Sequence, residues 1–309
     1  MTRERFVSQV ASALECCRRP TWCGGRSLAL SLAVSVALSG AMPGRTVAQA
    51  VARDHVTVEL VSELDAIVPG GTWLMALRLV SEPGWHTYWK NPGDAGSATT
   101  LEWALPPAFR AGPILWPTPR RIAEPPLAVY GYEGEVLLLV AVEAPPDLRS
   151  GQVVTLAAHA DWVVCREICL RGDADLTRRV AVAADAPAIS RRWGAPVRAE
   201  WASLPPLLHE WRVSADTAPG GYQLRIVPPQ HWSRPLGDVL FFAAAPGVID
   251  HAAAQPLTRV DGEYRLALTA SRYAATHPAR LSGLLVAPAG WDASGAVRAV
   301  EVDVPIGRR

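Results

Sequence analysis

Lysine, long apolar runs and helical periodicity are nearly absent from this sequence of 309 residues. Lys90 is the only lysine and basic residues are not clustered, which makes nucleic acid and anionic lipid poor partners. After residue 50 no stretch reaches 18 apolar residues, so we expect that part of the chain to be soluble, without a membrane span. The 27 prolines would interrupt long helices, which leaves short strands as the expected elements.

Motifs of several common enzyme classes are also missing. The sequence has no G-x-S-x-G motif of serine hydrolases and no phosphate-binding glycine loop, and its seven histidines are scattered. His159 and Asp161 would share one face of a strand, but no serine motif accompanies them. Two cysteines and one nearby histidine make an incomplete zinc site. We therefore expect neither a metal nor a cofactor.

The first 50 residues have the pattern of an export signal. The apolar run Ser27–Ala41 follows several arginines and is too short for a comfortable membrane span, and a small-residue pattern ends at Ala50. We expect residues 1–50 to be a signal peptide that is cleaved after Ala50, and an uncleaved anchor is the alternative. Arg18-Arg19 also suggests twin-arginine export, but the residues that follow fit that pattern badly.

Cleavage would change the charge and the number of cysteines. It lowers the number of basic residues from 30 to 24 and the number of acidic residues from 29 to 27, so the remaining 259 residues carry a net charge of −3. Of the five cysteines, only Cys165 and Cys169 remain. A disulfide across so short a loop stabilises a fold by only about 2 kcal/mol, which a chain of this length does not need. In an oxidising compartment this pair therefore favours exchange chemistry, and a plain structural disulfide is the alternative.

Short apolar or alternating runs with Pro and Gly between them predict an all-β chain. The predicted strands are Val56–Ser62, Thr72–Leu79, Trp85–Trp89, Thr99–Trp103, Val136–Val142, Val153–Val164 and Leu176–Val182, then Trp211–Ala215, Tyr222–Val227, Val239–Ala243, Tyr264–Thr269, Leu281–Val286 and Val297–Val304.

Composition divides this series into two β-sandwich domains in tandem. We expect a first domain at residues 51–185, a linker with a short helix at 186–206, and a second domain at 207–309. Gly220-Gly221 and Asp261-Gly262 predict hairpin turns in the second domain. One β-domain of about 250 residues is the alternative.

The cysteine pair should lie at the end of a hairpin. The flanking strands leave Arg166-Glu167-Ile168 as a tight connection, across which Cβ atoms can approach to the ~3.5–4.5 Å that a disulfide needs. A helix would also place both cysteines on one face. Arg166 would favour a thiolate, nearby acidic residues would oppose it, and His159 could act as a base. Two thiolates could instead bind copper(I).

An aromatic stretch, Gly84–Asp94, is the second candidate. Strand alternation places Trp85 and Trp89 on one face and His86 and Tyr88 on the other. Taken alone, this is an ordinary core strand with tryptophans inside a sandwich. The third candidate, Val129–Gly134, taken alone is an ordinary turn before an apolar strand.

Together, these stretches resemble the N-terminal periplasmic domain of DsbD-type thiol:disulfide interchange proteins, and most of all the Scs (suppressor of copper sensitivity) branch. The resemblance is strong over residues 55–182 and weaker through Val239–Asp250 and Leu281–Val286. The segments that carry it are GWHTYWKNPGD (84–94), Trp116–Val136 and ADWVVCREICL (160–170).

The resemblance implies an immunoglobulin-like sandwich whose cysteine pair cycles between dithiol and disulfide. By position, Cys169 would be the nucleophile towards client proteins and Cys165 the resolving thiol. Tyr130, Gly131 and Tyr132 match the family's cap loop, which shields the pair until a partner displaces it.

His86 and Tyr88 fall where the family places ring side chains near the sulfurs. The implied function is a periplasmic relay that takes electrons from a membrane thiol reductase and reduces thioredoxin-like oxidoreductases. Because this chain stops at Arg309, we expect that reductase to be separately encoded. The alternative is a non-catalytic periplasmic binding module with a structural disulfide, for example in copper tolerance.

Overall fold

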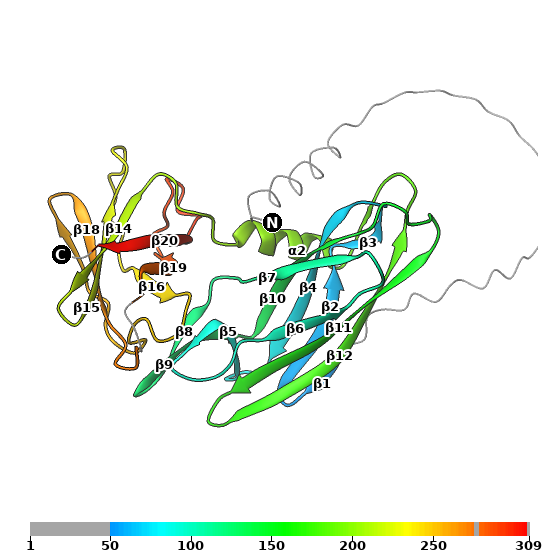
Figure 1. Cartoon of the computed structure of the whole chain (residues 1–309), viewed down its shortest axis with the longest axis horizontal. Helices are drawn as coiled ribbons and strands as arrows, with labels where there is room; N and C mark the ends of the chain where they lie inside the picture. Colours follow the sequence, from blue (N-terminus) through cyan, green and yellow to red (C-terminus); the bar gives the residue numbers. More distant parts are fainter. Residues whose placement is uncertain (1–49, 275–277, 308–309) are drawn as a thin grey trace, which may run out of the picture.

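The computed structural model describes residues 50–274 and 278–307, and this part of the chain is almost entirely β-structure (Figure 1). It confirms the all-β prediction. In the described residues, no helix has the length and apolar character needed to cross a membrane. Apart from Ala50, the expected signal peptide lies outside the described residues.

The strands divide into a first unit, β1 to β13 with helix α2, and a second unit, β14 to β20. The first unit contains β1 (Val51–Arg53), β2 (Val56–Ser62), β3 (Leu64–Ile67), β4 (Thr72–Ser81), β5 (His86–Gly93), β6 (Thr100–Ala104), β7 (Arg110–Leu115), β8 (Arg120–Glu124), β9 (Leu127–Glu133), β10 (Glu135–Glu143), β11 (Val153–Cys165), β12 (Cys169–Val182), β13 (Ala188–Ile189) and α2 (Gly194–Ser203). The second unit contains β14 (Arg212–Ala218), β15 (Gly221–Val227), β16 (Leu240–Ala243), β17 (Leu257–Val260), β18 (Glu263–Thr269), β19 (Arg280–Val286) and β20 (Ala299–Gly307).

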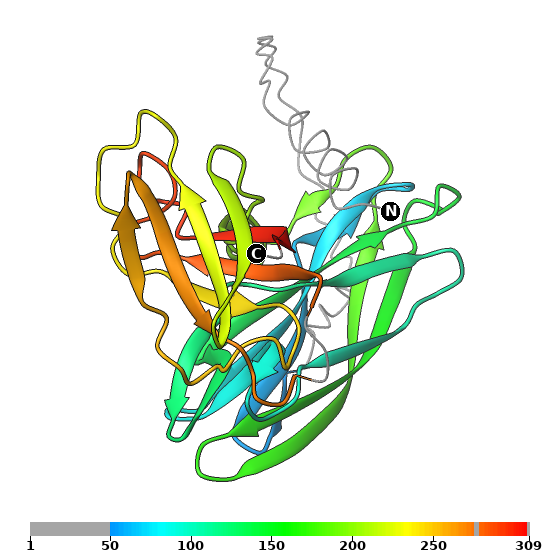
Figure 2. The same ribbon diagram turned by 60° about the vertical axis from the view of Figure 1, so that its left-hand side comes forward.

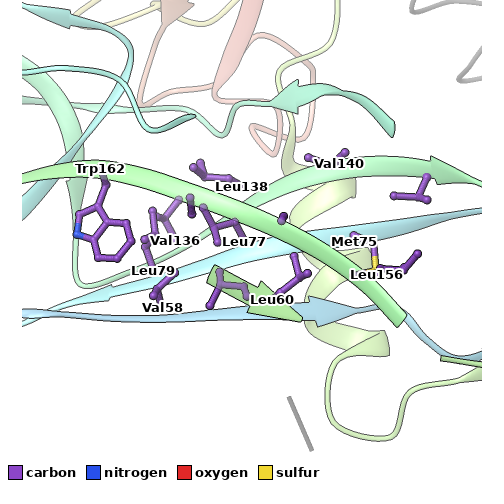
Figure 3. Close-up of a cluster of buried hydrophobic side chains, with 14 of the residues drawn as sticks. Val58, Leu60, Met75, Leu77, Leu79, Val136, Leu138, Val140, Leu156 and Trp162 are labelled. Carbon is purple, nitrogen blue, oxygen red and sulfur yellow. The ribbon is translucent and has the colours of Figure 1, made fainter. Parts of the chain in front are cut away.

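The first unit is a sandwich of two sheets. One sheet has the order β1-β2-β4-β10-β7, and the other has the order β13-β3-β12-β11-β5-β9-β8, with β6 also paired to β11. Alternate side chains of each strand point between the sheets, where Leu60, Leu77 and Leu138 of one sheet meet Leu156 and Trp162 of the other (Figure 3). Burial of these apolar side chains holds the two sheets together.

All seven predicted strands of this unit are present, but the Gly/Tyr segment before β10 is not a turn. Residues 127–133 form β9, which pairs with β5 on one side and β8 on the other. Gly131 allows the close pairing with β5, because a Cβ atom there would lie 2.2 Å from the Thr87 carbonyl oxygen. The sequence-based expectation of a turn for this segment is therefore wrong.

The expected linker contains the expected short helix, α2, which packs on the outer face of the five-stranded sheet. Trp193, Val197 and Leu204 form a separate apolar cluster there with side chains of β2, β4 and β10. Arg198 donates to the buried Glu63 carboxylate at 2.6 Å and adds an ion pair to this contact. Part of the predicted linker is thus packed against the first unit.

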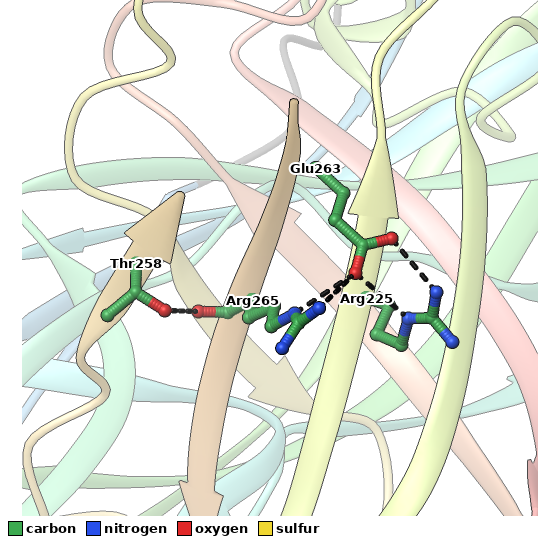
Figure 4. Close-up of polar contacts among 4 residues, drawn as sticks. All are labelled: Arg225, Thr258, Glu263 and Arg265. Atoms are coloured by element: carbon green, nitrogen blue, oxygen red, sulfur yellow. Dashed lines mark hydrogen bonds and ion pairs between the residues drawn. The ribbon is translucent and has the colours of Figure 1, made fainter. Parts of the chain in front are cut away.

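The second unit has the strand order β16-β19-β20-β14-β15-β18-β17, and side chains from both halves form one core. Asp261 and Gly262 form the predicted two-residue turn between β17 and β18, both with positive φ. In the β14–β15 hairpin the turn residues are Pro219-Gly220, one position earlier than expected. Across β15 and β18, Glu263 joins the guanidinium groups of Arg225 and Arg265 (Figure 4).

The Trp162 indole requires a glycine opposite it in the β11–β12 hairpin. A Cβ atom at Gly172 would lie 2.6 Å from the Trp162 ring. We expect Gly172→Ala to lower the free energy of unfolding by about 1–3 kcal/mol, because the ring must shift within a packed core. Urea unfolding measures this change.

The matched control is Gly112→Ala in β7. The nearest atom to a Cβ there is the Ala141 carbonyl oxygen at 3.6 Å, an ordinary contact. We expect Gly112→Ala to change the free energy of unfolding by less than about 0.5 kcal/mol. Equal unfolding midpoints for both variants would contradict the packing argument.

Candidate redox site

Cys165 and Cys169 form a disulfide at the end of the longest hairpin of the first unit. β11 and β12 pair continuously from Val153↔Ala181 to Cys165↔Cys169, and Arg166–Ile168 closes the hairpin. The S–S distance is 1.98 Å and the two Cα atoms are 4.2 Å apart. The predicted tight connection between two strands is therefore confirmed, and the helical alternative is excluded.

The two cysteines differ in their exposure to solvent. Cys169 is exposed, whereas Cys165 is only 2% exposed. Cys165 forms an apolar cluster with Tyr88 and the fully buried Val129, and three partly buried side chains pack around it. These are Ala95, Ile122 and Val163. A partner can thus reach Cys169 first, while Cys165 is buried in the cluster with Tyr88.

A series of polar side chains leads from the exposed cysteine into the protein. The Tyr88 hydroxyl lies 3.8 Å from Cys169 Sγ and 3.3 Å from His86 Nε2, and His86 Nε2 lies 3.6 Å from Glu124 Oε1. Because a disulfide sulfur carries no hydrogen, the Tyr88 hydroxyl is the donor to Cys169 in this state. The same hydroxyl could stabilise a thiolate at Cys169 after reduction.

Burial decides the charge of these groups. It lowers the pKa of His86, although Glu124 and Glu133 act in the opposite direction. Burial also raises the pKa of Tyr88 to about 12, with a further contribution from Glu124. At neutral pH the groups beside the disulfide are therefore a neutral imidazole and a protonated phenol.

Arg166, which lies between the two cysteines in the chain, packs on the Trp85 ring. Its guanidinium carbon lies 5.5 Å from the centre of the Trp85 ring, and the His55 ring stacks on Trp85 at 4.0 Å. This cation–π contact holds the positive charge of Arg166 in one position. Arg166 directly follows Cys165 in the chain.

Two of the sequence-based site residues do lie beside the pair, and three others do not have the expected contacts. His86 and Tyr88 share the face of β5 that points to the cysteines. Tyr130 instead packs on Phe242 of the second unit, and Tyr132 donates to the Pro117 carbonyl oxygen at 2.8 Å. Because β9 is a strand, these two rings point away from the sulfurs. Neither ring therefore lies against the cysteines, and the role of this segment as a cap over the pair stays a prediction.

Gly131, the third residue of that expectation, is a paired position of β9 opposite Tyr88. Val129, in the same strand, belongs to the buried cluster of Tyr88 and Cys165. It lies on the same face of β9 as Gly131, which counting two residues back would have shown once a strand was assumed. Glu124 gave no signal in the sequence, because only strand pairing brings β8 to His86.

His159 also lies away from the disulfide. It is six residues before Cys165 in an extended strand, a separation of about 20 Å. Its Nδ1 lies 2.8 Å from Asp175 Oδ1, and this hydrogen bond raises the pKa of the exposed His159. A direct role as the base for the cysteines is therefore excluded in this conformation. Within residues 50–274 and 278–307, no three His, Cys, Asp or Glu side chains form a group that could hold a metal.

Comparisons with known proteins agree with the cysteine hairpin and its sandwich. Residues 55–181 match the family described as "Thiol:disulfide interchange protein DsbD, N-terminal". The N-terminal periplasmic domain of ScsB from Proteus mirabilis aligns with a TM-score of 0.54 at 18% identity, over 82% of this chain and 95% of that one. At this identity the likeness concerns the fold.

Spo0M, a sporulation control protein from Bacillus subtilis, aligns over 81% of this chain and 90% of its own, with a TM-score of 0.22 at 13% identity. That likeness is too weak for an inference. No curated protein matches the sequence significantly. The expected resemblance to DsbD-type N-terminal domains is confirmed for residues 55–181.

The lowered pKa of His86 predicts a dependence of stability on pH. Below the ordinary histidine value of 6.5, the unfolded chain takes up a proton that the buried ring resists, so the free energy of unfolding falls as the pH is lowered. We expect His86→Gln to lose less stability than the parent protein between pH 7 and pH 5. Urea unfolding at both pH values measures the difference.

His209→Gln is the control, because His209 is exposed and lies in the second unit. The free energy of unfolding of this variant should change with pH as that of the parent protein does. If the free energy of unfolding of His86→Gln fell as much between pH 7 and pH 5 as that of the parent protein, His86 would not resist protonation in the folded state.

Proposed function

We propose that the protein carries electrons between periplasmic and membrane partners, because residues 55–181 match the family of DsbD N-terminal thiol:disulfide interchange domains. The observation that carries this proposal is the unequal cysteine pair. One cysteine is exposed at the tip of a hairpin, and the other is buried in an apolar cluster with Tyr88. This arrangement suits a thiol that attacks partners and a second thiol that stays protected.

The proposed reaction is a pair of thiol–disulfide exchanges. In the dithiol form, the Cys169 thiolate attacks one sulfur of a client disulfide, and the other client sulfur leaves as a thiolate. The Cys165 thiolate then attacks Cys169 Sγ, which re-forms the Cys165–Cys169 disulfide and releases the client as a dithiol. Two electrons pass to the client, and two protons follow them to its sulfurs.

The groups beside the cysteines would assist without a cofactor. The Tyr88 hydroxyl is close enough to donate a hydrogen bond to a forming Cys169 thiolate, and Arg166 adds a nearby positive charge. His86 can hold the Tyr88 hydroxyl in position, because its Nε2 lies 3.3 Å from that oxygen. The imidazole and the phenol stay neutral at pH 7, so they add no charge of their own beside the thiolate.

The partners follow from the chemistry. We expect periplasmic thioredoxin-like proteins as clients and a separately encoded membrane thiol reductase as electron donor. Export through the expected signal peptide would bring the protein to an oxidising compartment, where a disulfide can persist. The DsbD description and the periplasmic origin of the similar ScsB domain support this location.

The reduction potential separates this function from a structural disulfide. We expect a potential of about −120 to −270 mV for the Cys165–Cys169 pair, the range of known exchange proteins. Alkylation and mass measurement across glutathione and dithiothreitol buffers give this value. A potential below about −300 mV would indicate a fixed structural bond and favour the binding-module alternative, including its possible role in copper tolerance.

Trapping with single-cysteine variants tests the order of attack. Cys165→Ser should accumulate a mixed disulfide with a thioredoxin-like client, because no resolving thiol remains to release it. Cys169→Ser should form little of this complex, because Cys165 is buried. Mass spectrometry after acid quenching identifies the complex, and the double variant is the control. More trapping by Cys169→Ser than by Cys165→Ser would reverse the assigned roles.

A further inference from the structure

The loop between β5 and β6, residues 94–99, lies on the Tyr88 ring. A Cβ atom at Gly96 would lie 2.2 Å from Tyr88 Cζ and 2.3 Å from Cε1, so the Gly96 backbone lies directly against the ring carbon that carries the hydroxyl. Gly96 also has a φ of +91°, a conformation that residues with a side chain rarely adopt. Because the Tyr88 ring is only 1% exposed, a side chain at position 96 would have to displace a buried group.

The hydroxyl of the same ring contacts the exposed cysteine. It lies 3.8 Å from Cys169 Sγ and 3.3 Å from His86 Nε2. Ala95, the residue before Gly96, packs against the apolar cluster that contains Tyr88. A hydrogen bond of this length to sulfur can lengthen little before it is lost. A displacement of the ring by the loop would therefore separate the hydroxyl from Cys169.

The first residue of the loop is anchored to β9 at two points. The Asp94 N–H donates to the Ala128 carbonyl oxygen at 3.1 Å, and the Asp94 carboxylate accepts from the Ala128 N–H at 2.9 Å. One residue earlier, the Gly93 N–H donates to Asn91 Oδ1 at 3.2 Å. These contacts fix the direction in which the chain leaves β5.

The second unit contacts the strands at the base of the loop. Asn91 of β5 is fully buried, and its amide donates to the Ala243 carbonyl oxygen at 2.8 Å. Arg121 of β8 forms an arginine fork, because its guanidinium donates to the carbonyl oxygens of His251 at 2.9 Å and Ala252 at 2.6 Å. The second unit accordingly lies beside the β8–β9 ribbon in both views (Figures 1 and 2). The base of the loop thus has a fixed frame.

We propose that Gly96 is a positioning residue of the redox site, and that its loop holds the Tyr88 ring where the hydroxyl can donate to a Cys169 thiolate. This inference rests on the proposed function, in which Cys169 attacks the client. The step concerned is the ionisation of Cys169, in which the thiol gives its proton to solvent and the thiolate accepts the hydrogen bond from the hydroxyl. This hydrogen bond stabilises the thiolate, so more of the reactive form is present at neutral pH.

The ionisation constant of Cys169 in reduced Cys165→Ser protein measures this effect. The full chain is treated with iodoacetamide over a range of pH values, and mass spectrometry follows alkylation of the peptide that carries Cys169. We expect Tyr88→Phe to lower the ionisation constant about tenfold, because the thiolate loses a charge-assisted hydrogen bond. We expect Gly96→Ala to lower it at least about threefold, because the added methyl group displaces the ring and its hydroxyl.

The double variant separates positioning from other effects of the methyl group. If Gly96 acts through the hydroxyl, Gly96→Ala added to Tyr88→Phe should leave the ionisation constant of Cys169 unchanged. These variants keep the ionisable groups beside the pair, among them Arg166, His86 and Glu124. An equal decrease with and without the Tyr88 hydroxyl would overturn the inference.

Gly151→Ala is the matched control. Gly151 has a φ of +83°, and no atom lies within 4 Å of a Cβ there, so this variant introduces similar backbone strain without the contact. Its ionisation constant for Cys169 should equal that of the Cys165→Ser parent. Circular dichroism and thermal melting establish that each variant is folded. A folded Gly96→Ala protein with the ionisation constant of the parent would overturn the inference.

Asp94→Ala takes the place of Gly96→Ala if the latter does not fold. It removes the carboxylate that accepts from the Ala128 N–H and adds no atom to the packed loop. We expect it to lower the ionisation constant of Cys169 when the Tyr88 hydroxyl is present, and not in the Tyr88→Phe background. The same ionisation constant as the parent would contradict a positioning role of the loop.

Failure of this inference and failure of the proposed function give different results. If the pair has the potential of a structural bond but Gly96→Ala still lowers the ionisation constant through Tyr88, the exchange function fails and the positioning role stands. If the pair exchanges with clients but the ionisation of Cys169 does not depend on Gly96, the exchange function stands and the positioning role fails.

Discussion

Side chains alternate between the two faces of β9, and this alternation separates the residue that joins the Tyr88–Cys165 cluster from the residue that contacts the second unit. Val129 packs in that cluster, while Tyr130 faces Phe242 and His251. A slip of one residue would exchange the two faces and place a tyrosine in the cluster. Gly131 helps to fix the register, because only a residue without Cβ can pair so closely with β5.

The hairpin makes the two sulfurs chemically unequal. Continuous pairing along β11 and β12 carries the cysteines beyond the sandwich core to the end of the sheet, where only Cys165 is covered. Next to Cys169, burial keeps the His86 ring neutral and the Tyr88 hydroxyl protonated. A thiolate formed there would meet the Tyr88 hydroxyl as a hydrogen-bond donor, while Trp85 holds the positive charge of Arg166 nearby.

The second unit contains no cysteine in its sequence, yet it contacts β5, the strand that carries His86 and Tyr88, and the β8–β9 ribbon beyond it. A spacer would need no buried asparagine and no arginine fork at this junction. These contacts use backbone carbonyl oxygens as acceptors, so they require the shape of the second unit more than particular side chains there. The fold of the second unit therefore helps to hold the sheet edge of the first unit in place.

The all-β fold, most of the strands, the cysteine hairpin and the face of β5 that carries His86 and Tyr88 could be predicted from the sequence. These features follow from local alternation and turn residues, which act within a few positions along the chain. The strand character of β9, the place of Val129 in the cluster of Cys165, and the distance of His159 from the sulfurs required the three-dimensional structure. The Arg121 contact to His251 joins residues 130 positions apart. Such contacts depend on how sheets and units pack, and no local pattern encodes that packing.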